Sequence, residues 1–199
     1  MLLYHGSSKS GLQTLRPFLA DHGKPYVYFS TDATAAAFYA ACAVERPYYF
    51  FPYGYDAAAR SVYTETYPDA LRETYAKKGG YLYVCELPES ELLRFPSNPH
   101  MRLTANETPV LRAEAIDNLY DWFLKREAEG KLTIQRYETL AKSELASWHG
   151  MVLEELRAAC AETHDNAYAE FVQRAMPQVW ERFAGEPTYE CSYSGPLNG

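Results

Sequence analysis

The chain has 199 residues, enough for one substantial domain or for a domain with a helical extension. Its formal net charge is −7, most of the acidic excess lies after residue 110, and no basic stripe would grip a nucleic-acid backbone. No apolar stretch reaches the roughly 18 residues that a membrane span needs. We therefore expect neither a membrane protein nor a general nucleic-acid binder.

The first strand predicted is Leu2 to Tyr4, a short apolar run that opens into a loop at His5-Gly6-Ser7. A polar side chain such as His5 at the end of a strand, beside a glycine that lets a ligand approach the backbone, is typical of a binding site. The plain alternative is a core histidine that bonds a backbone carbonyl.

A second strand is predicted from Tyr26 to Phe29, and it ends at Ser30-Thr31. Either Thr31 or Asp32 then caps an alanine-rich helix that runs through residues 33–40 and carries Tyr39. Taken singly, Tyr28 and Tyr39 fit packed aromatic positions in a tyrosine-rich sheet, and only their joint spacing points to a ligand.

The rest of the chain changes from strands to helices. Further strands are expected at residues 48–51, 81–87, 92–95, 101–104 and 106–111, with a helical zone at 56–75 and a short strand or extended link at 131–135. From Arg112 onward the apolar period becomes 3.6, and it predicts helices at 115–130, 140–163 and 167–183, the last of them kinked or restarted at Pro177.

The positions of the cysteines and histidines indicate which disulfides and metal sites to expect. Four cysteines lie far apart and form no CxxC pair: Cys42, Cys85, Cys160 and Cys191. With no secretory leader pattern at the first residues, we expect free thiols in a cytoplasmic protein. His149 and His164 have no convincing set of further ligands, so no metal site is predicted.

His5-Gly6-Ser7 after the first strand, then Tyr28-Phe29, then Tyr39 eleven residues on, resembles the NAD-binding half of the ADP-ribosyltransferase superfamily. The likeness is to the diphtheria-toxin-like branch that includes the poly(ADP-ribose) polymerases, and it covers roughly residues 1–42, 80–88 and 104–111. The resemblance implies that His5 bonds the nicotinamide ribose, that the Gly6 backbone holds the carboxamide, and that the two tyrosine rings flank the nicotinamide.

The chain departs from the family pattern in two places. Where polymerase-like members carry a serine that bonds the carboxamide, this chain has Ala36, and Ser30 or Ser7 could take its place. The segment 48–78 has no obvious counterpart in the family.

The resemblance also requires a catalytic glutamate on a later strand. Asn106-Glu107-Thr108-Pro109 resembles the family strand that carries it, so Glu107 is the candidate and Glu86 the reserve. Breaking the nicotinamide–ribose bond passes through an oxocarbenium-like state. A carboxylate there can orient the sugar, offset the developing positive charge and polarise the incoming nucleophile.

The expected fold is therefore α+β: an ADP-ribosyltransferase-like split antiparallel sheet with flanking helices and a C-terminal helical extension. The expected division is an NAD-binding domain at 1–115, a helical region packed on it at 116–184, and a tail at 185–199. The implied activity is mono-ADP-ribosyl transfer or NAD hydrolysis, with NAD as substrate and a protein, a nucleic-acid terminus or water as acceptor.

Two alternatives stay open on the same fold. One is an inactive module that binds NAD or a nucleotide derivative, with the acidic helices docking a partner. The other is an RNA 2′-phosphotransferase, which requires several arginines around a phosphate, and none flanks the matched segments in that way.

Overall fold

The computed structural model describes residues 1–19, 23–41, 53–95, 97–163 and 166–185. The chain forms two compact units. The first comprises residues 1–43, 53–63 and 71–134, and the second comprises 44–52, 64–70 and 135–199. The strand expected at 48–51 and nearly all of the expected tail lie outside the described residues.

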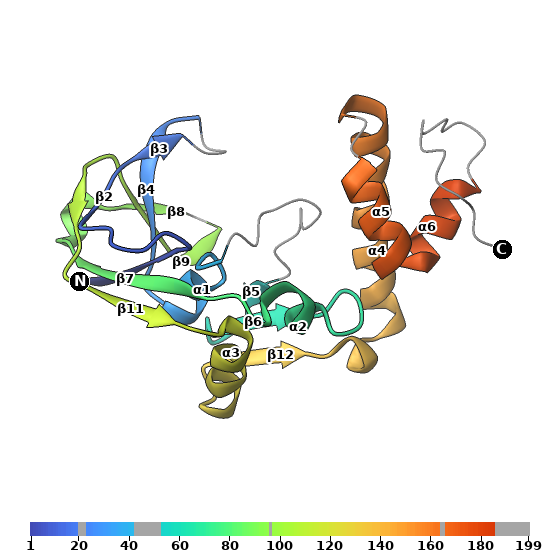
Figure 1. The fold of residues 1–199 in the computed structure, drawn as a ribbon, viewed down its shortest axis with the longest axis horizontal. Helices are drawn as coiled ribbons and strands as arrows, with labels where there is room; N and C mark the ends of the chain where they lie inside the picture. The colour runs from blue at the N-terminus through green and yellow to red at the C-terminus, as the bar shows by residue number, and fades with distance from the viewer. Residues whose placement is uncertain (20–22, 42–52, 96, 164–165, 186–199) are drawn as a thin grey trace. The chain divides into compact units, whose positions relative to one another are not determined.

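Among the described residues, the first unit contains the strands and three α-helices (Figure 1). The strands are β1 (Leu2–Ser7), β2 (Thr14–Leu15), β3 (Phe18–Leu19), β4 (Pro25–Ser30), β5 (Tyr53–Tyr55), β6 (Ser61–Thr64), β7 (Gly80–Glu86), β8 (Leu93–Phe95), β9 (Asn98–Thr104), β10 (Thr108–Pro109), β11 (Arg112–Ile116) and β12 (Leu132–Gln135). The helices are α1 (Ala33–Ala37), α2 (Ala70–Tyr75) and α3 (Leu119–Ala128), with a 3₁₀ turn η1 (Glu89–Glu91). Single end residues of β6, β12 and α2 belong to the second unit.

The main sheet has the strand order β11-β7-β1-β4-β9-β8, with β3 added to β4, and it is antiparallel throughout. Smaller sheets pair β10 with β2 and order β12, β6 and β5. Antiparallel sheets combined with several helices confirm the α+β class that the sequence predicts.

The main sheet is nearly divided between β1 and β4. Six residues of β1 pair with β7, and four residues of β4 pair with β9. Between β1 and β4, the only pair in the described part of the chain is Tyr4 with Ser30. Figure 1 shows β4 at a steep angle to β7, the strand that pairs with β1. At this angle β4 and β1 separate after one pair.

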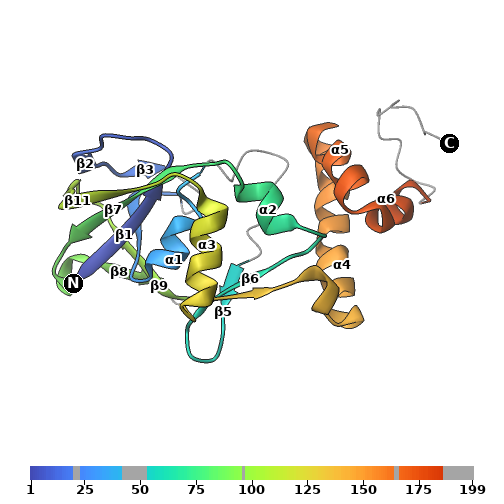
Figure 2. The same ribbon diagram turned by 60° about the horizontal axis from the view of Figure 1, so that its bottom comes forward.

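Side chains of the sheet alternate between a core face and a face that α1 covers. The core face buries Leu3, Leu15, Val27, Phe29, Tyr83 and Cys85. On the other face α1 packs against β1 and β7, and α3 lies beside α1 (Figures 1 and 2). Phe38, directly after α1, is fully buried and stacks on Phe123 with ring centroids 4.5 Å apart.

Two glycines set the distance between α1 and the sheet. A Cβ at Gly6 would lie 2.0 Å from the carbonyl oxygen of Ala36, and one at Gly80 would lie 2.1 Å from that of Ala40. No side chain fits in either space, so α1 lies directly on the backbone of β1, and the turn that follows the helix lies directly on the backbone of β7.

Three sequence-based expectations are wrong. The first strand continues through His5, Gly6 and Ser7, because all three pair with β7. The expected helical zone at 56–75 contains β6, and only its end is helical, as α2. Residues 112–116 form β11, because the free edge of β7 pairs with them and overrides their helical period.

The helices of the second unit are α4 (Lys142–Ala158), α5 (Asn166–Ala175) and α6 (Pro177–Ala184), with a 3₁₀ turn η2 (Tyr137–Thr139) and a π-helical turn η3 (Ala159–Thr163). Their apolar faces form one core with Tyr67, whose ring meets Phe171 edge-on at 5.4 Å. The expected restart at Pro177 is confirmed, since this proline begins α6.

Candidate functional site

The candidate site is the β1–β4 junction, defined as residues 4–7 of β1 and 28–30 of β4. His5 lies at its centre. Its Nδ1 is 2.8 Å from the backbone oxygen of Tyr28, across the stretch where the two strands no longer pair. Because a carbonyl oxygen can only accept, Nδ1 carries the proton and donates it. The imidazole thus replaces a missing backbone hydrogen bond.

Burial makes His5 a neutral group. It lowers the pKa of His5, and the hydrogen bond to the Tyr28 oxygen opposes this only in part. With the proton on Nδ1, the neutral ring has its lone pair on Nε2. The described residues give Nε2 no hydrogen bond, so it can accept one from a hydroxyl of a ligand.

The lowered pKa predicts a pH-dependent stability. Below about pH 6.5 the unfolded chain binds a proton at this position that the folded chain does not. The free energy of unfolding therefore falls on acidification, by at most about 1.4 kcal/mol per pH unit for one proton, until the pH passes below the folded-state pKa. His5→Gln should remove this part of the fall. Urea unfolding from pH 7.5 to 5 measures it.

His149, in α4, has a pKa lowered by burial and by the nearby Arg182. It contributes to the pH dependence of both proteins, so the difference between wild type and His5→Gln isolates His5. Identical pH profiles for the two would contradict a neutral, buried His5.

Gly6 and Ser7 continue β1 beyond the last pair with β4. The α carbon of Gly6 faces α1, so this glycine is required by the close approach of the helix as well as by any ligand at its backbone. The Ser7 hydroxyl accepts a hydrogen bond from the Lys9 amide at 3.2 Å. Tyr83 then donates to the Lys9 carbonyl at 2.6 Å, which holds the segment after β1 on the sheet.

Tyr28 and Ser30 lie on the α1 face of β4, the same face as Gly6, because Tyr4 pairs with Ser30. The Tyr28 ring packs against Phe18 with centroids 5.3 Å apart. The Ser30 hydroxyl is buried and accepts a hydrogen bond from the Asp32 amide at 3.0 Å. Asp32 caps α1 by accepting from the Thr34 amide, which decides between the two predicted caps.

Tyr39, just after α1, is 40% exposed, and its hydroxyl lies 2.7 Å from that of Tyr53 in β5. Burial, and then the neighbouring Tyr39, raise the pKa of Tyr53, so its hydroxyl is neutral at physiological pH. Asn98 Oδ1 accepts from the amides of His100 and Met101, which leaves its NH₂ group to donate to the hydroxyls of Tyr53 and Tyr55.

His100 connects three segments of the first unit. Its Nε2 is 2.7 Å from the Ala59 carbonyl, its Nδ1 is 2.7 Å from the Thr31 hydroxyl, and its own carbonyl accepts from the Thr31 amide at 3.0 Å. The ring of Tyr55 packs against the imidazole with centroids 5.0 Å apart.

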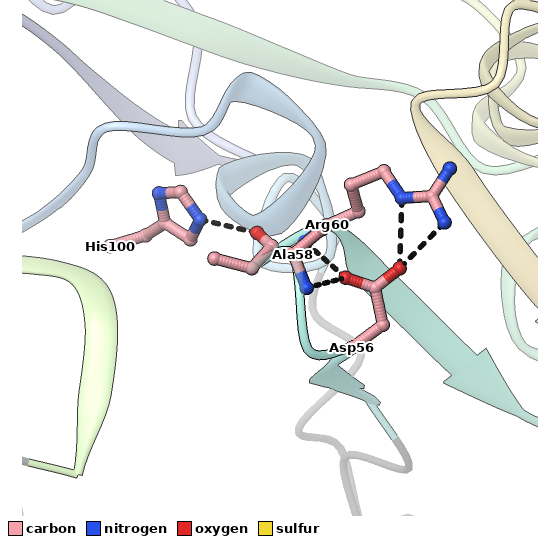
Figure 3. Close-up of polar contacts among 5 residues, drawn as sticks. Asp56, Ala58, Arg60 and His100 are labelled. Atoms are coloured by element: carbon pink, nitrogen blue, oxygen red, sulfur yellow. Dashed lines mark hydrogen bonds and ion pairs between the residues drawn. The ribbon is translucent and has the colours of Figure 1, made fainter.

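The Ala59 carbonyl is presented by a rigid turn between β5 and β6. The Asp56 carboxylate accepts from the amides of Ala58 and Arg60 at 2.9 Å each and from Arg60 Nε at 2.8 Å. These bonds hold the pKa of Asp56 below its usual value. Ala59 has a φ of 58°, a left-handed conformation that the turn imposes. Figure 3 shows Asp56 bonded to Ala58 and Arg60, with His100 reaching the turn from the other side.

Within the described residues, neither candidate carboxylate forms a hydrogen bond or an ion pair with His5. Glu107 precedes β10 and forms an ion pair with Arg16 at 3.3 Å, with side chains that are 60% and 77% exposed. Glu86 pairs with Leu2, on the face of the sheet opposite to His5 and about 10 Å farther along the strand. Glu107 lies in the layer that covers the face of His5, since Leu15 and Val110, from the strand pair beside it, pack on the core face.

The sequence analysis missed Tyr53, Tyr55, Asn98 and His100. The β-branched and aromatic residues Val62, Tyr63 and Thr64 were the available signal, because such a run predicts a strand and hence a hairpin with 53–55. With a hairpin predicted there, Asp56 would have been assigned to a turn and not to a helix.

No family model, curated protein or solved structure matches the chain. Within the described residues, no helix is both long and apolar enough to cross a bilayer. In the same part of the chain, no group of three or more His, Cys, Asp or Glu side chains could hold a metal ion. Cys85 and Cys160 are buried free thiols, and burial raises the pKa of Cys85 to about 11.

Proposed function

We propose that this chain binds NAD at the β1–β4 junction and cleaves the nicotinamide–ribose bond, passing a single ADP-ribosyl group to an acceptor or to water. The proposal includes the finer fold assignment, an ADP-ribosyltransferase-like split sheet. The sheet supports it through the single residue pair that joins β1 to β4.

The observation that carries the proposal is the state of His5. Its neutral ring is fixed across the unpaired stretch by the bond from Nδ1 to the Tyr28 carbonyl, and Nε2 has a lone pair to offer. Such a group accepts a hydrogen bond from a sugar hydroxyl without adding charge beside a cationic pyridinium ring.

The other proposed roles follow the resemblance. The Gly6 backbone is proposed to hold the carboxamide, with Ser7 or Ser30 beside it, and the rings of Tyr28 and Tyr39 to flank the nicotinamide. His5 is proposed to bond the ribose of the same nucleotide. Glu107 is proposed to stabilise the oxocarbenium-like state.

A second candidate is a module that binds NAD without cleaving it. It is favoured by one observation: the Glu107 side chain is 60% exposed, so the proposed catalytic carboxylate lies in water and not in an enclosed site. Both candidates bind NAD, and only the first one releases nicotinamide.

The test measures NAD binding by calorimetry and nicotinamide release by chromatography, for the wild type and for His5→Ala. We expect saturable binding and slow release by the wild type. His5→Ala removes one hydrogen bond to the ligand, worth about 1.4 kcal/mol, so we expect NAD to bind about tenfold more weakly.

The matched control is His149→Ala, a half-buried histidine of the second unit, which should leave NAD binding unchanged. NAD binding without nicotinamide release would support the second candidate, the module that binds NAD without cleaving it. If millimolar NAD does not bind to the wild type at all, both candidates are wrong.

A further inference from the structure

Thr31 and His100 form a hydroxyl–imidazole pair that the proposed NAD site does not use. The Thr31 oxygen is 2.7 Å from His100 Nδ1, and both side chains are partly exposed. A hydroxyl within hydrogen-bond distance of an imidazole, which is itself oriented by a third group, is the arrangement that activates a nucleophile.

The third group is the Ala59 carbonyl, which decides where the imidazole carries its proton. This oxygen lies 2.7 Å from Nε2 and can only accept, so Nε2 bears the hydrogen. In the neutral ring the lone pair is then on Nδ1, and the Thr31 hydroxyl donates to it. His100 is thus set to accept the hydroxyl proton.

The turn that presents Ala59 is held by side-chain hydrogen bonds as well as by its backbone. Asp56 bonds two amides and the Arg60 side chain, and Ala59 keeps a left-handed φ that costs a residue with a Cβ about 1 kcal/mol or more. Asp56 and Ala59 therefore act as positioning residues for His100 (Figure 3).

Thr31 also lies next to the proposed site. It directly follows Ser30, the residue of the β1–β4 junction that pairs with Tyr4. The Thr31 amide donates to the His100 carbonyl at 3.0 Å, which holds this residue beside β9 just after β4 ends.

We infer that Thr31 is a site of self-modification: its hydroxyl is an acceptor for the ADP-ribosyl group, with His100 as the base. The inference rests on the proposed function. The Thr31 oxygen bonds the anomeric carbon of the ribose while the carbon–nitrogen bond to nicotinamide breaks. The nitrogen takes that electron pair, nicotinamide leaves as a neutral molecule, and the hydroxyl proton passes to His100 Nδ1.

The experiment incubates the full chain with NAD and measures nicotinamide release and intact mass in the same samples. We expect the wild type to gain the mass of one ADP-ribosyl unit, mapped to Thr31 by peptide mass spectrometry. Thr31→Val keeps the shape of the side chain but lacks the hydroxyl. It should not gain the added mass, while nicotinamide is still released because water accepts the ADP-ribosyl group. Thr31→Ser should restore the added mass.

His100→Gln should slow the gain in mass by about 10²- to 10⁴-fold, the usual contribution of a general base. The matched control is Thr133→Val, an exposed strand threonine of the same unit, which should change neither measurement. Thr31→Ser also guards against misfolding, since it keeps the hydroxyl within reach of His100.

The possible failures are distinguishable. Nicotinamide release with no added mass, or with mass mapped to another residue, would overturn the role of Thr31 and leave the proposed function standing. Added mass that persists in Thr31→Val would do the same. The absence of both nicotinamide release and added mass in the wild type would end the proposed function and this inference together.

Discussion

Gly6→Ala is expected to destabilise the first unit by about 3 kcal/mol, at the upper end of what overpacking a core usually costs. The added methyl group would lie 2.0 Å from the Ala36 carbonyl oxygen and 2.9 Å from the Ala40 amide nitrogen. Both are backbone atoms, so no side chain can rotate away. For a chain of this size, the melting temperature should fall by about 6–12 °C.

The helix cannot simply move away from the sheet. A Cβ at Gly80 on β7 would lie 2.1 Å from the carbonyl oxygen of Ala40, so the chain just after α1 is packed equally closely on the neighbouring strand. Moving the helix would also disturb Phe38, which stacks on Phe123, Tyr53 and Tyr63. Thermal unfolding followed by circular dichroism measures the effect.

The matched control is Gly54→Ala in β5, where nothing lies within 4 Å of the added methyl group. It should melt within about 2 °C of the wild type, in keeping with an unstrained surface substitution. Equal melting temperatures for the two variants would show that α1 does not lie on the backbone of β1.

Glu107→Gln is expected to lower nicotinamide release by about 10²- to 10⁴-fold with NAD binding kept. The amide has the size of the carboxylate but not its charge, so it cannot offset the positive charge of an oxocarbenium-like state. Glu107 lies beside β2 and β10, on the side of the sheet that carries His5. Its ion pair with Arg16 is exposed, and such pairs are weak enough to exchange for a ligand.

Glu86→Gln is the control for this substitution. Glu86 is also exposed, but it lies on the opposite face from His5 and pairs with Leu2 near the start of β1. Nicotinamide release should be unchanged in this variant. If release falls in Glu86→Gln and not in Glu107→Gln, the two carboxylates exchange roles. If it falls in neither, neither Glu107 nor Glu86 takes part in the cleavage.

Local pattern was enough where an element depends on its own residues. The alternation of residues 81–87 predicts β7, and the isolated run at 131–135 predicts β12, because strand residues alternate whichever neighbour they pair with. Asp32 as a cap and Pro177 as a helix start follow from side chains that act on their own backbone.

The sequence alone determined the α+β class, the helical C-terminal part and His5 as a residue to examine. Tertiary structure decided the rest, because strand pairing and hydrogen bonds join residues far apart in the chain. Residues 112–116 became a strand only because β7 had a free edge for them. The proposed role of His100 depends on its hydrogen bonds to Thr31 and Ala59, which lie 69 and 41 positions away in the sequence. A local sequence pattern covers only a few neighbouring residues, so it cannot predict contacts between residues this far apart in the chain. The position of each functional group therefore depends on the tertiary structure.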